Sequence, residues 1–403
     1  MFNDTVEAMV IEEAGMALAE DVGPAINAFL ETRPTSPRVL AMGEPTHWLE
    51  ALPRLRNRVF QHLVEHHGYR ALAIESCCMK GLVANAYVVD GAGTVDEALE
   101  NGFSHGFGQF DSSRELIEWM RAYNQDHGDD PVRFFGADGP LEITEAASPR
   151  EAITGLNAFF GSPYEVDDLL GPDERWTNPD AAMDPTQSVG SSDDVRQLRL
   201  IADDLRARVV TETPRLVAQS RDDWWLARLY ARTANGLLRY HENMAWNSPQ
   251  RIPRLLAIRD GMMAENLKAV TEYGKTMVAA HNKHLQREKS VWEFADAVQE
   301  WWSAGAIVSA ELGDQYAFLA TAIGTAADYD IGAPAPDTLE GSLSGDCVLE
   351  SSRIDTTGLR MRDDNDHRWF PIDPAHIKDT DGIVFIKDVP RQSDLASAST
   401  RPH

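Results

Sequence analysis

The chain has 403 residues, of which 43% are hydrophobic and 25% are charged, and this composition is ordinary for a globular protein. The 64 acidic side chains exceed the 37 basic ones and leave a formal charge of −27, which disfavours nucleic acids and anionic membranes as partners. Solubility alone is the simpler explanation of such an excess. No apolar run is long enough to cross a bilayer.

The cysteines and the first residues bear on the cellular compartment. The three cysteines are Cys77, Cys78 and Cys347, and they form no CxxC pair, so neither a disulfide framework nor a thiolate zinc site is expected. Residues 1–7 lack the basic and apolar regions of a secretory signal. We therefore predict a cytoplasmic protein.

Strand and helix signals alternate over the first third of the chain. An apolar run at residues 38–42 is followed by helical spacing of apolar residues over 52–64 and by a second strand at 71–74. This βαβ pattern favours a parallel pair with a right-handed crossover. A further helix over residues 113–123 precedes a third strand at 132–135.

Long helices dominate residues 148–273. Apolar residues recur at helical spacing over 195–210, 224–240 and 252–270, whereas residues 161–192 are rich in Gly, Pro and Asn and predict a loop or mobile lid. This section is interpreted as a helical insertion between the third and fourth core strands.

The α/β pattern then resumes with a strand at 277–280, a helix over 291–302 and a final strand at 382–387. The fold class predicted is α/β, with a central, largely parallel sheet flanked by helices and interrupted by the large helical insertion. The expected organisation is a first part of the core at 1–147, the insertion at 148–273, a second part of the core at 274–390, and a disordered tail at 391–403.

Four of the apolar strands end in polar residues that suit an active site. They lead into Gly43-Glu44-Pro45-Thr46-His47, Glu75, Asp138 and His281-Asn282-Lys283-His284. Ligands of open α/β sheets bind beyond the carboxyl ends of the strands. The pattern therefore predicts an enzyme whose site lies at this edge.

The first of these segments is the sharpest motif. A histidine that follows a carboxylate by three residues, as His47 follows Glu44, can be a general base whose ring is oriented by an acid. Capping of the following helix is an equal alternative. A di-iron carboxylate site would require two Glu-x-x-His motifs on helices, and Pro45 and the preceding strand argue against the first of them.

The second motif contains His281 and His284. At this spacing both rings share a face if the segment is helical, so they could ligate a metal or bind a developing anion. Metal ligation is the weaker hypothesis because no HExxH occurs. One such histidine alone is more often structural, but His47, Glu75 and His281 occupy equivalent positions on separate strands.

Residues 102–106 match the G-x-S-x-G nucleophile elbow of serine hydrolases letter by letter. That motif requires an apolar strand before it and a helix after it, whereas residues 95–100 are acidic and helix-like here. Loop flexibility explains the glycines more simply, and we do not expect Ser104 to be a nucleophile.

An ordered set of segments resembles one family. Leu40-Ala41-Met42-Gly43-Glu44-Pro45-Thr46-His47 resembles the Gly-Glu-x-x-His signature of the erythromycin esterase family, and Ala73-Ile74-Glu75 resembles its next strand. The resemblance extends over about residues 36–387. The further similar segments are residues 119–124, 258–266, 280–284 and 382–386.

The resemblance implies roles for individual residues. His47 would be the general base that activates water without a covalent intermediate, with Glu44 and Glu75 orienting or charging it. Arg259 and Asp260 match a family motif for which a structural role is the alternative. The positions expected to bind the substrate or its oxyanion are Arg56, His281, His284, Asp138 and Arg259.

The sequence departs from the family pattern beside the proposed base. Pro45 and Trp48 stand where small residues are common, and Ala279 stands where a tryptophan often precedes the Ala-His-Asn segment. These changes reshape the pocket wall, so the resemblance alone does not assign a macrolide as substrate.

The expected partner is a small molecule, with a macrolide or polyketide as the class that the resemblance implies, and neither a nucleic acid nor a membrane. No cofactor is expected. Because family members differ in metal dependence, the alternative is a divalent ion held by Glu44, His47 or His281.

Three functions are compatible with these residues and with the family resemblance. The first is hydrolysis of a carboxylic ester or macrolactone, as in antibiotic resistance. The second is a dehydratase, lyase or cyclase of natural-product biosynthesis that uses the same cleft. The third is a non-catalytic binding protein, which the presence of every matched motif residue disfavours. Hydrolysis would add one water to the substrate mass, cyclisation would leave it unchanged and dehydration would remove one.

Overall fold

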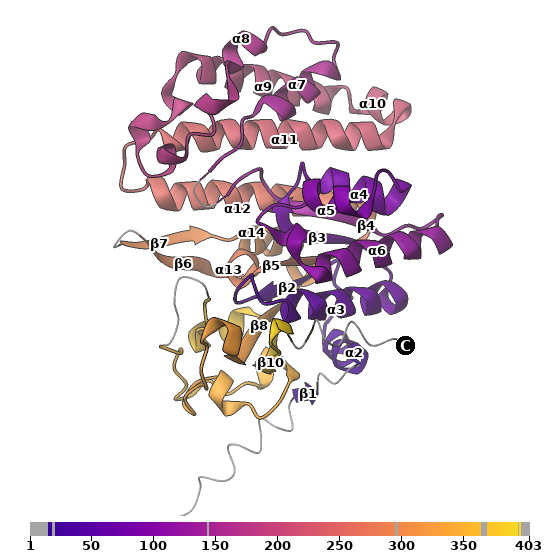
Figure 1. Cartoon of the computed structure of the whole chain (residues 1–403), viewed down its shortest axis with the longest axis vertical. Coiled ribbons are helices and arrows are strands. Elements are labelled where there is room, and N and C mark those ends of the chain that lie inside the picture. The colour runs from indigo at the N-terminus through magenta and orange to yellow at the C-terminus, as the bar shows by residue number, and fades with distance from the viewer. Residues whose placement is uncertain are drawn as a thin grey trace, which may run out of the picture.

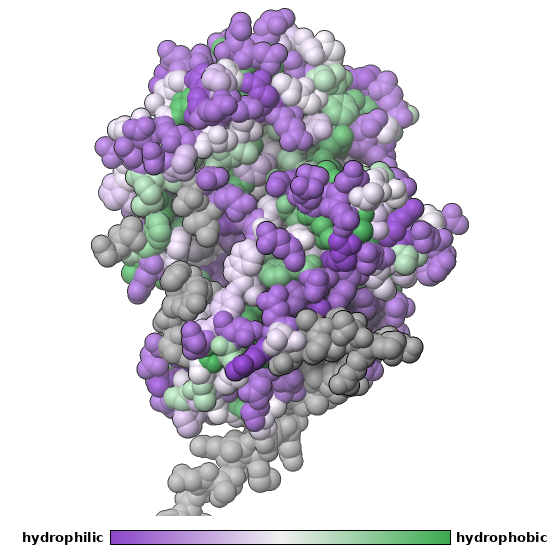
Figure 2. All heavy atoms as spheres, viewed as in Figure 1, coloured by the Kyte–Doolittle hydropathy of each residue, from purple (hydrophilic) through white to green (hydrophobic). Residues whose placement is uncertain are grey.

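A computed structural model of the chain defines residues 15–17, 21–142, 145–294, 297–363, 369–393 and 395 (Figure 1). The first seven residues and most of the predicted tail lie outside the described part of the chain. Hydrophilic side chains cover most of the face shown in Figure 2, as the charge excess predicts. None of the helices in the described ranges combines the length and the apolar content that a membrane span requires.

The central sheet has eight strands in the order β1-β9-β10-β8-β2-β5-β3-β4. The six strands from β10 to β4 are parallel to their neighbours, while β9 and β1 extend the sheet in antiparallel fashion. The largely parallel α/β sheet expected from the sequence is confirmed. The strands are β1 Gly15–Ala17, β2 Val39–Glu44, β3 Tyr69–Cys77, β4 Arg133–Asp138, β5 Lys275–His281, β8 Tyr316–Ala326, β9 Cys347–Glu350 and β10 Gly382–Val389.

Helices cover both faces of this sheet because the strands are apolar on both sides. Residues such as Leu72 and Ile323 face the helices of the first third of the chain, and Ala73 and Phe318 face α11, α12 and α14. The helices outside the insertion are α2 Gly23–Glu31, α3 Ala51–His67, α4 Gly81–Asp90, α5 Val95–Asn101, α6 Asp111–Asp126, α13 Asn282–Leu285 and α14 Ala304–Leu312.

The predicted helical insertion lies between β4 and β5, and Figure 1 shows its helices stacked on one side of the sheet. The helix α12 contacts the sheet, and α11 packs on α12 and on the outer helices. The outer layer has its own apolar core around Leu198 and Leu238. The inserted helices are α7 Arg150–Ala158, α8 Asp167–Leu170, α9 Asp193–Thr211, α10 Thr213–Gln219, α11 Arg221–Met244 and α12 Arg251–Val270.

The helix predicted over residues 291–302 is wrong. This segment belongs to an antiparallel hairpin of β6 Lys289–Phe294 and β7 Ala297–Trp302. Apolar residues at 291, 294, 298 and 301 imitate helical spacing, yet burial alternates along β7, with Gln299 and Trp301 inside. Period-two burial and β-branched or aromatic residues are the marks of a strand.

Two other expectations differ from the structure in detail. The strands β2 and β3 lie in one sheet but are not paired, because β5 lies between them. The apolar strand β8, which the sequence analysis missed, lies between β10 and β2. The segment 161–192 contains α8 and short 3-10 turns, and the buried Trp176 anchors it through a hydrogen bond to the carbonyl of Leu170.

Candidate active site

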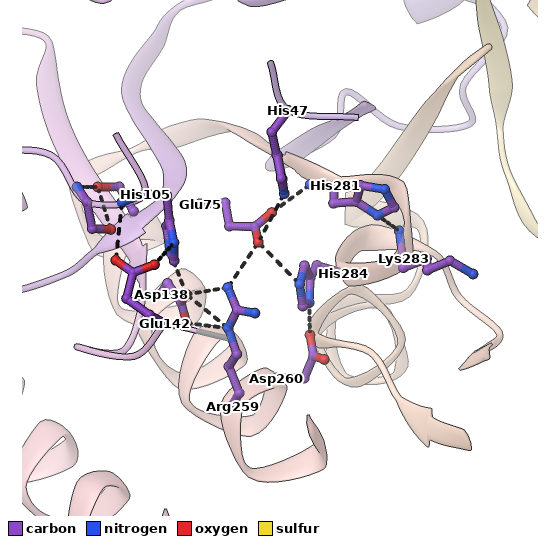
Figure 3. A network of polar contacts seen from close by, with 12 residues as sticks. His47, Glu75, His105, Asp138, Glu142, Arg259, Asp260, His281, Lys283 and His284 are labelled. Carbon is purple, nitrogen blue, oxygen red and sulfur yellow. Dashed lines mark hydrogen bonds and ion pairs between the residues drawn. The ribbon is translucent and has the colours of Figure 1, made fainter. Parts of the chain in front are cut away.

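The polar ends of four adjacent strands meet at one edge of the sheet. In the register of β2 and β5, Glu44 lies opposite His281, while Glu75 and Asp138 come from the ends of β3 and β4. The order β2-β5-β3-β4 makes these ends neighbours, although residues 148–273 intervene in the sequence. The predicted gathering of polar residues is therefore present, and Figure 3 shows it from close by.

Glu75 is the centre of the network. Its Oε1 accepts a hydrogen bond from Arg259 Nη2 at 3.0 Å and lies 3.3 Å from His284 Nε2, and its Oε2 accepts from the backbone N–H of His281 at 2.8 Å. The side chain is only 4% exposed. Although burial favours the neutral acid, the charges of His284 and His47 hold the pKa of Glu75 well below its ordinary value. Glu75 is therefore a buried carboxylate.

His47 forms a pair with Glu44, as its spacing predicts. The Nδ1 of His47 lies 2.8 Å from Glu44 Oε1, whereas Nε2 lies 3.8 Å from Glu75 Oε1, beyond hydrogen-bonding distance. Because an ionised carboxylate only accepts, the proton of the neutral ring resides on Nδ1 and the lone pair on Nε2. Burial opposes the charged ring, but Glu75 and Glu44 outweigh it and raise the pKa of His47.

Arg259 joins Glu75 to Asp138, which is completely buried. Its Nε lies 3.0 Å and its Nη2 2.6 Å from Asp138 Oδ2. On the other side of Asp138, His105 Nε2 approaches the same Oδ2 at 3.3 Å, and its Nδ1 lies 2.5 Å from Glu142. Burial opposes the charge on the ring, yet the two acids raise the pKa of His105 to about 9. In this arrangement Arg259 and Asp138 bind each other.

The ring of His284 is held by Asp260 of α12. Its Nδ1 lies 2.8 Å from Asp260 Oδ1, which also accepts from the backbone N–H of Ala304 at 3.0 Å, and Trp301 of the hairpin donates its Nε1–H to Oδ2. Although burial disfavours the charged ring, Asp260 and Glu75 raise the pKa of His284 to about 10. His284 is thus a charged imidazolium between two carboxylates.

His281 does not share a face with His284. Its Nδ1 accepts the backbone N–H of Lys283 at 3.1 Å and caps α13, while its Nε2 donates to the carbonyl of Pro45 at 3.2 Å. Burial and the charge of His47 lower the pKa of His281 well below its ordinary value. In this geometry His281 is a neutral ring that ties the two loops together.

Arg56 lines a small cavity with His47, Glu44 and Glu75. The cavity measures about 20 Å³, which is enough for one water molecule. Arg56 donates from Nε and Nη2 to the neutral amide oxygen of Asn57 at 3.1 and 2.8 Å. Burial lowers the pKa of Arg56 to about 10, so it remains a cation at neutral pH. The cavity therefore combines a histidine, a cation and space for water.

A larger pocket of about 490 Å³ is lined in part by Phe370, whose ring meets His281 edge-on at 5.2 Å between centroids. Lys283 lines this pocket with its Nζ 4.7 Å from the centroid of the Phe370 ring. Its volume falls within the range of small-molecule sites, roughly 300–1,000 Å³.

Ser104 is buried and bonded to the backbone. Its Oγ accepts from the N–H of Cys77 at 2.8 Å, and its own N–H donates to Ser76 Oγ at 2.8 Å. We expect Ser104→Ala to retain turnover and to lower the free energy of unfolding by about 1–3 kcal/mol, because a buried N–H loses its acceptor. Activity assays and urea unfolding check both parts. A folded Ser104→Ala protein without activity would contradict this and make Ser104 the nucleophile.

Metal binding was the alternative for Glu44, His47 and His281. Within the described ranges, no group of three His, Cys, Asp or Glu side chains is arranged to hold an ion. His281 has both ring nitrogens engaged, and the guanidinium of Arg259 already supplies positive charge to Glu75. In this arrangement protein side chains supply the positive charge of the site. Addition of a chelator is the direct test of the metal alternative.

Sequence reasoning missed His105, Glu142 and Trp301 in this network. His105 lies in the segment that imitates a nucleophile elbow, and its φ of 55° is unusual for a residue with a side chain. Trp301 lies in the segment predicted to be helical, so the sequence does not indicate its contact with Asp260. The local signal for His105 is a histidine followed by a glycine in a glycine-rich segment.

Comparisons with known proteins agree with this architecture. Solved structures with a TM-score of 0.70 are a Bacillus cereus protein, 16% identical, and a succinoglycan biosynthesis protein, 15% identical; each match covers 96% of this chain and 98% of the other. A histidine-to-asparagine variant of the erythromycin esterase EreC in its open conformation is 16% identical, with a TM-score of 0.62 over 91% of this chain and 92% of that one. At these identities the likeness shows the fold.

No curated protein matches the sequence significantly. The family model for erythromycin esterase matches residues 64–389, a range that begins after the Gly43–His47 motif and includes Glu75, Asp138, Arg259, His281 and His284. Since this range is most of the chain, the protein belongs to the erythromycin esterase family.

Proposed function

We propose that the protein hydrolyses a carboxylic ester or macrolactone, with His47 as the general base. The observation that carries the proposal is that Nε2 of His47 makes no hydrogen bond to any described residue and lies beside a cavity that can hold one water, while Nδ1 is fixed by Glu44. A general base needs this geometry, in which one nitrogen is oriented and the other faces the proton to be removed. Membership of the erythromycin esterase family supports a hydrolase.

In the proposed reaction, His47 Nε2 takes a proton from water as the water oxygen attacks the ester carbonyl. The tetrahedral oxyanion is stabilised by the charge of Arg56, which is held by a neutral partner and shares the cavity. The imidazolium then returns its proton to the departing alcohol oxygen. The products are a carboxylic acid and an alcohol, and no acyl-enzyme forms.

The buried charges around Glu75 are proposed to position this base. Glu75 holds the backbone of His281, and His281 holds the carbonyl of Pro45 in the loop that carries His47. The cavity of about 20 Å³ has space for water but not for a substrate, so the body of the ester is proposed to occupy the pocket of about 490 Å³. A macrolactone or polyketide is the class proposed for this pocket.

The test is mass spectrometry of a panel of macrolides, simple lactones and linear esters incubated with the protein, with and without a chelator. A gain of one water mass is expected. Loss of one water, or an unchanged mass with a new retention time, would instead identify a dehydratase, lyase or cyclase. Inactivation by the chelator that is reversed by a divalent ion would add a metal to the site.

The raised pKa of His47 predicts the pH profile. A base must be neutral to act, so kcat/KM should rise with pH through a value above the ordinary 6.5 of histidine. Glu44→Gln removes a carboxylate that raises this pKa, and the acid limb should therefore move to lower pH while the maximal rate falls. Initial rates between pH 5 and 9 measure both effects; a limb that moves to higher pH would contradict the assignment.

A further inference from the structure

A further cavity, separate from the two already described, lies between α4, the edge strand β4 and the inserted helices α11 and α12. It measures about 210 Å³, and none of the residues that line it also lines the cavity beside His47. A cavity of about 150 Å³ can hold benzene, so this one has space for a small single-ring molecule.

The feature that points to a ligand is the guanidinium of Arg232 on α11. Its Nε donates to Asn266 Oδ1 at 2.6 Å, and Asn266 is itself fixed because its Nδ2 donates to the carbonyl of Ala137 at 2.9 Å. Within the described residues, no acceptor contacts Nη1 or Nη2 of Arg232, and no carboxylate forms an ion pair with it. The two outer nitrogens are thus held in a fixed orientation without a partner.

The Arg232 side chain is half-buried and is among the residues that line the cavity. Its carbon Cζ lies 5.1 Å from the centroid of the Trp225 ring, which offsets part of the cost of desolvation. Loss of surrounding water lowers the pKa of Arg232 to about 10, an effect that outweighs the opposite influence of Cys78, Glu265 and Glu272. The outer edge of a guanidinium fits the two oxygens of a carboxylate.

The remaining walls select the rest of the ligand. Phe135 and Trp225 supply flat apolar surface, and Arg133, stacked 4.8 Å from the centroid of Tyr273, adds a second cation that has no ion pair with any described residue. The acids at the cavity, Asp90, Asp222 and Asp223, are exposed to water and therefore screened. They disfavour polyanions such as phosphate more than a single carboxylate.

We infer that this cavity binds a small aromatic monocarboxylate, whose carboxylate pairs with Arg232 and whose ring packs between Phe135 and Trp225. The site lies behind the catalytic network, because Asn266 holds the carbonyl of Ala137, the residue before Asp138. It is independent of the proposed hydrolysis.

Calorimetric titration of the whole chain with benzoate tests the inference. Benzoate should bind, and Arg232→Gln should weaken it by about tenfold or more, because two charge-assisted hydrogen bonds are lost. The matched control is Arg228→Gln, one turn earlier on α11, since Arg228 is ion-paired with Glu272 and does not line the cavity. It should leave the affinity within about twofold.

Three further titrations make the outcome decisive. Benzamide, which has the same shape without the charge, and inorganic phosphate should both bind more weakly than benzoate. Titration of Arg56→Gln shows which cavity holds the ligand. If Arg56→Gln loses binding while Arg232→Gln retains it, benzoate occupies the cavity beside His47 and the inference is overturned. No heat with the unaltered protein, or equal binding by Arg232→Gln, would also overturn it. If Arg232→Gln does not fold, Arg133→Gln takes its place.

Discussion

His47→Ala is expected to lower kcat/KM by about 10²–10⁴-fold, the usual contribution of a general base. The physical reason is that Nε2 of this ring lies beside the water-sized cavity. This nitrogen has no hydrogen-bond partner among the described residues and can accept a proton. The pair with Glu44 is partly exposed, with 29% of the His47 side chain accessible, so its loss should cost little stability. The water-mass gain of a hydrolysed lactone is the measurement.

The control for this variant is His66→Ala on α3, because His66 is an exposed histidine away from the cavity. It should retain full turnover. Circular dichroism and urea unfolding should give the same fold for both proteins. Turnover that survives in His47→Ala within a factor of ten would remove the general-base assignment, and loss of turnover together with unfolding would make His47 structural.

Arg259→Leu is expected to lower the free energy of unfolding by about 3–5 kcal/mol, the typical cost of breaking a buried ion pair from one side. Arg259 is 11% exposed and holds Asp138 and Glu75, which are 0% and 4% exposed. Without the guanidinium, two buried carboxylates face each other with less positive charge between them. His105 and His284 retain their contacts with Asp138 and Glu75 and limit the loss.

Urea unfolding at neutral pH measures this change, and Arg254→Leu is the matched control on α12. Arg254 is exposed and stacks on the ring of Trp246 at 5.1 Å. Its replacement should alter the free energy of unfolding by no more than about 0.5 kcal/mol. If Arg259→Leu unfolds no more easily than Arg254→Leu, the network around Glu75 does not stabilise the fold and its charges serve only the reaction.

Local sequence was sufficient for the elements whose burial pattern is unambiguous. The helices α9, α11 and α12 have continuous apolar stripes and were predicted within a few residues of their bounds. The hairpin β6–β7 is not predictable in this way, because its apolar residues fit both the helical period and the strand period. Its packing against α12 is what favours two strands. The strand β8 was overlooked although its eleven residues are almost all buried.

The same distinction between local and tertiary information applies to the candidate site. Acids and histidines at strand ends are visible in the sequence because residue type and a preceding apolar run suffice to find Glu44, His47, Glu75 and His284. Their partners are not visible, since a hydrogen bond depends on which strands become neighbours. The insertion of β5 between β2 and β3 brings His281 to Glu75.

The sequence by itself thus determined the α/β class, the helical insertion and the edge of the sheet at which polar residues gather. Tertiary structure alone decided that His281 is a neutral cap, that His105 and Trp301 join the network, and that Nε2 of His47 makes no hydrogen bond within the described part of the chain. The reason is physical: hydrophobic periodicity is encoded locally, whereas the pairing of buried charges depends on contacts between distant segments.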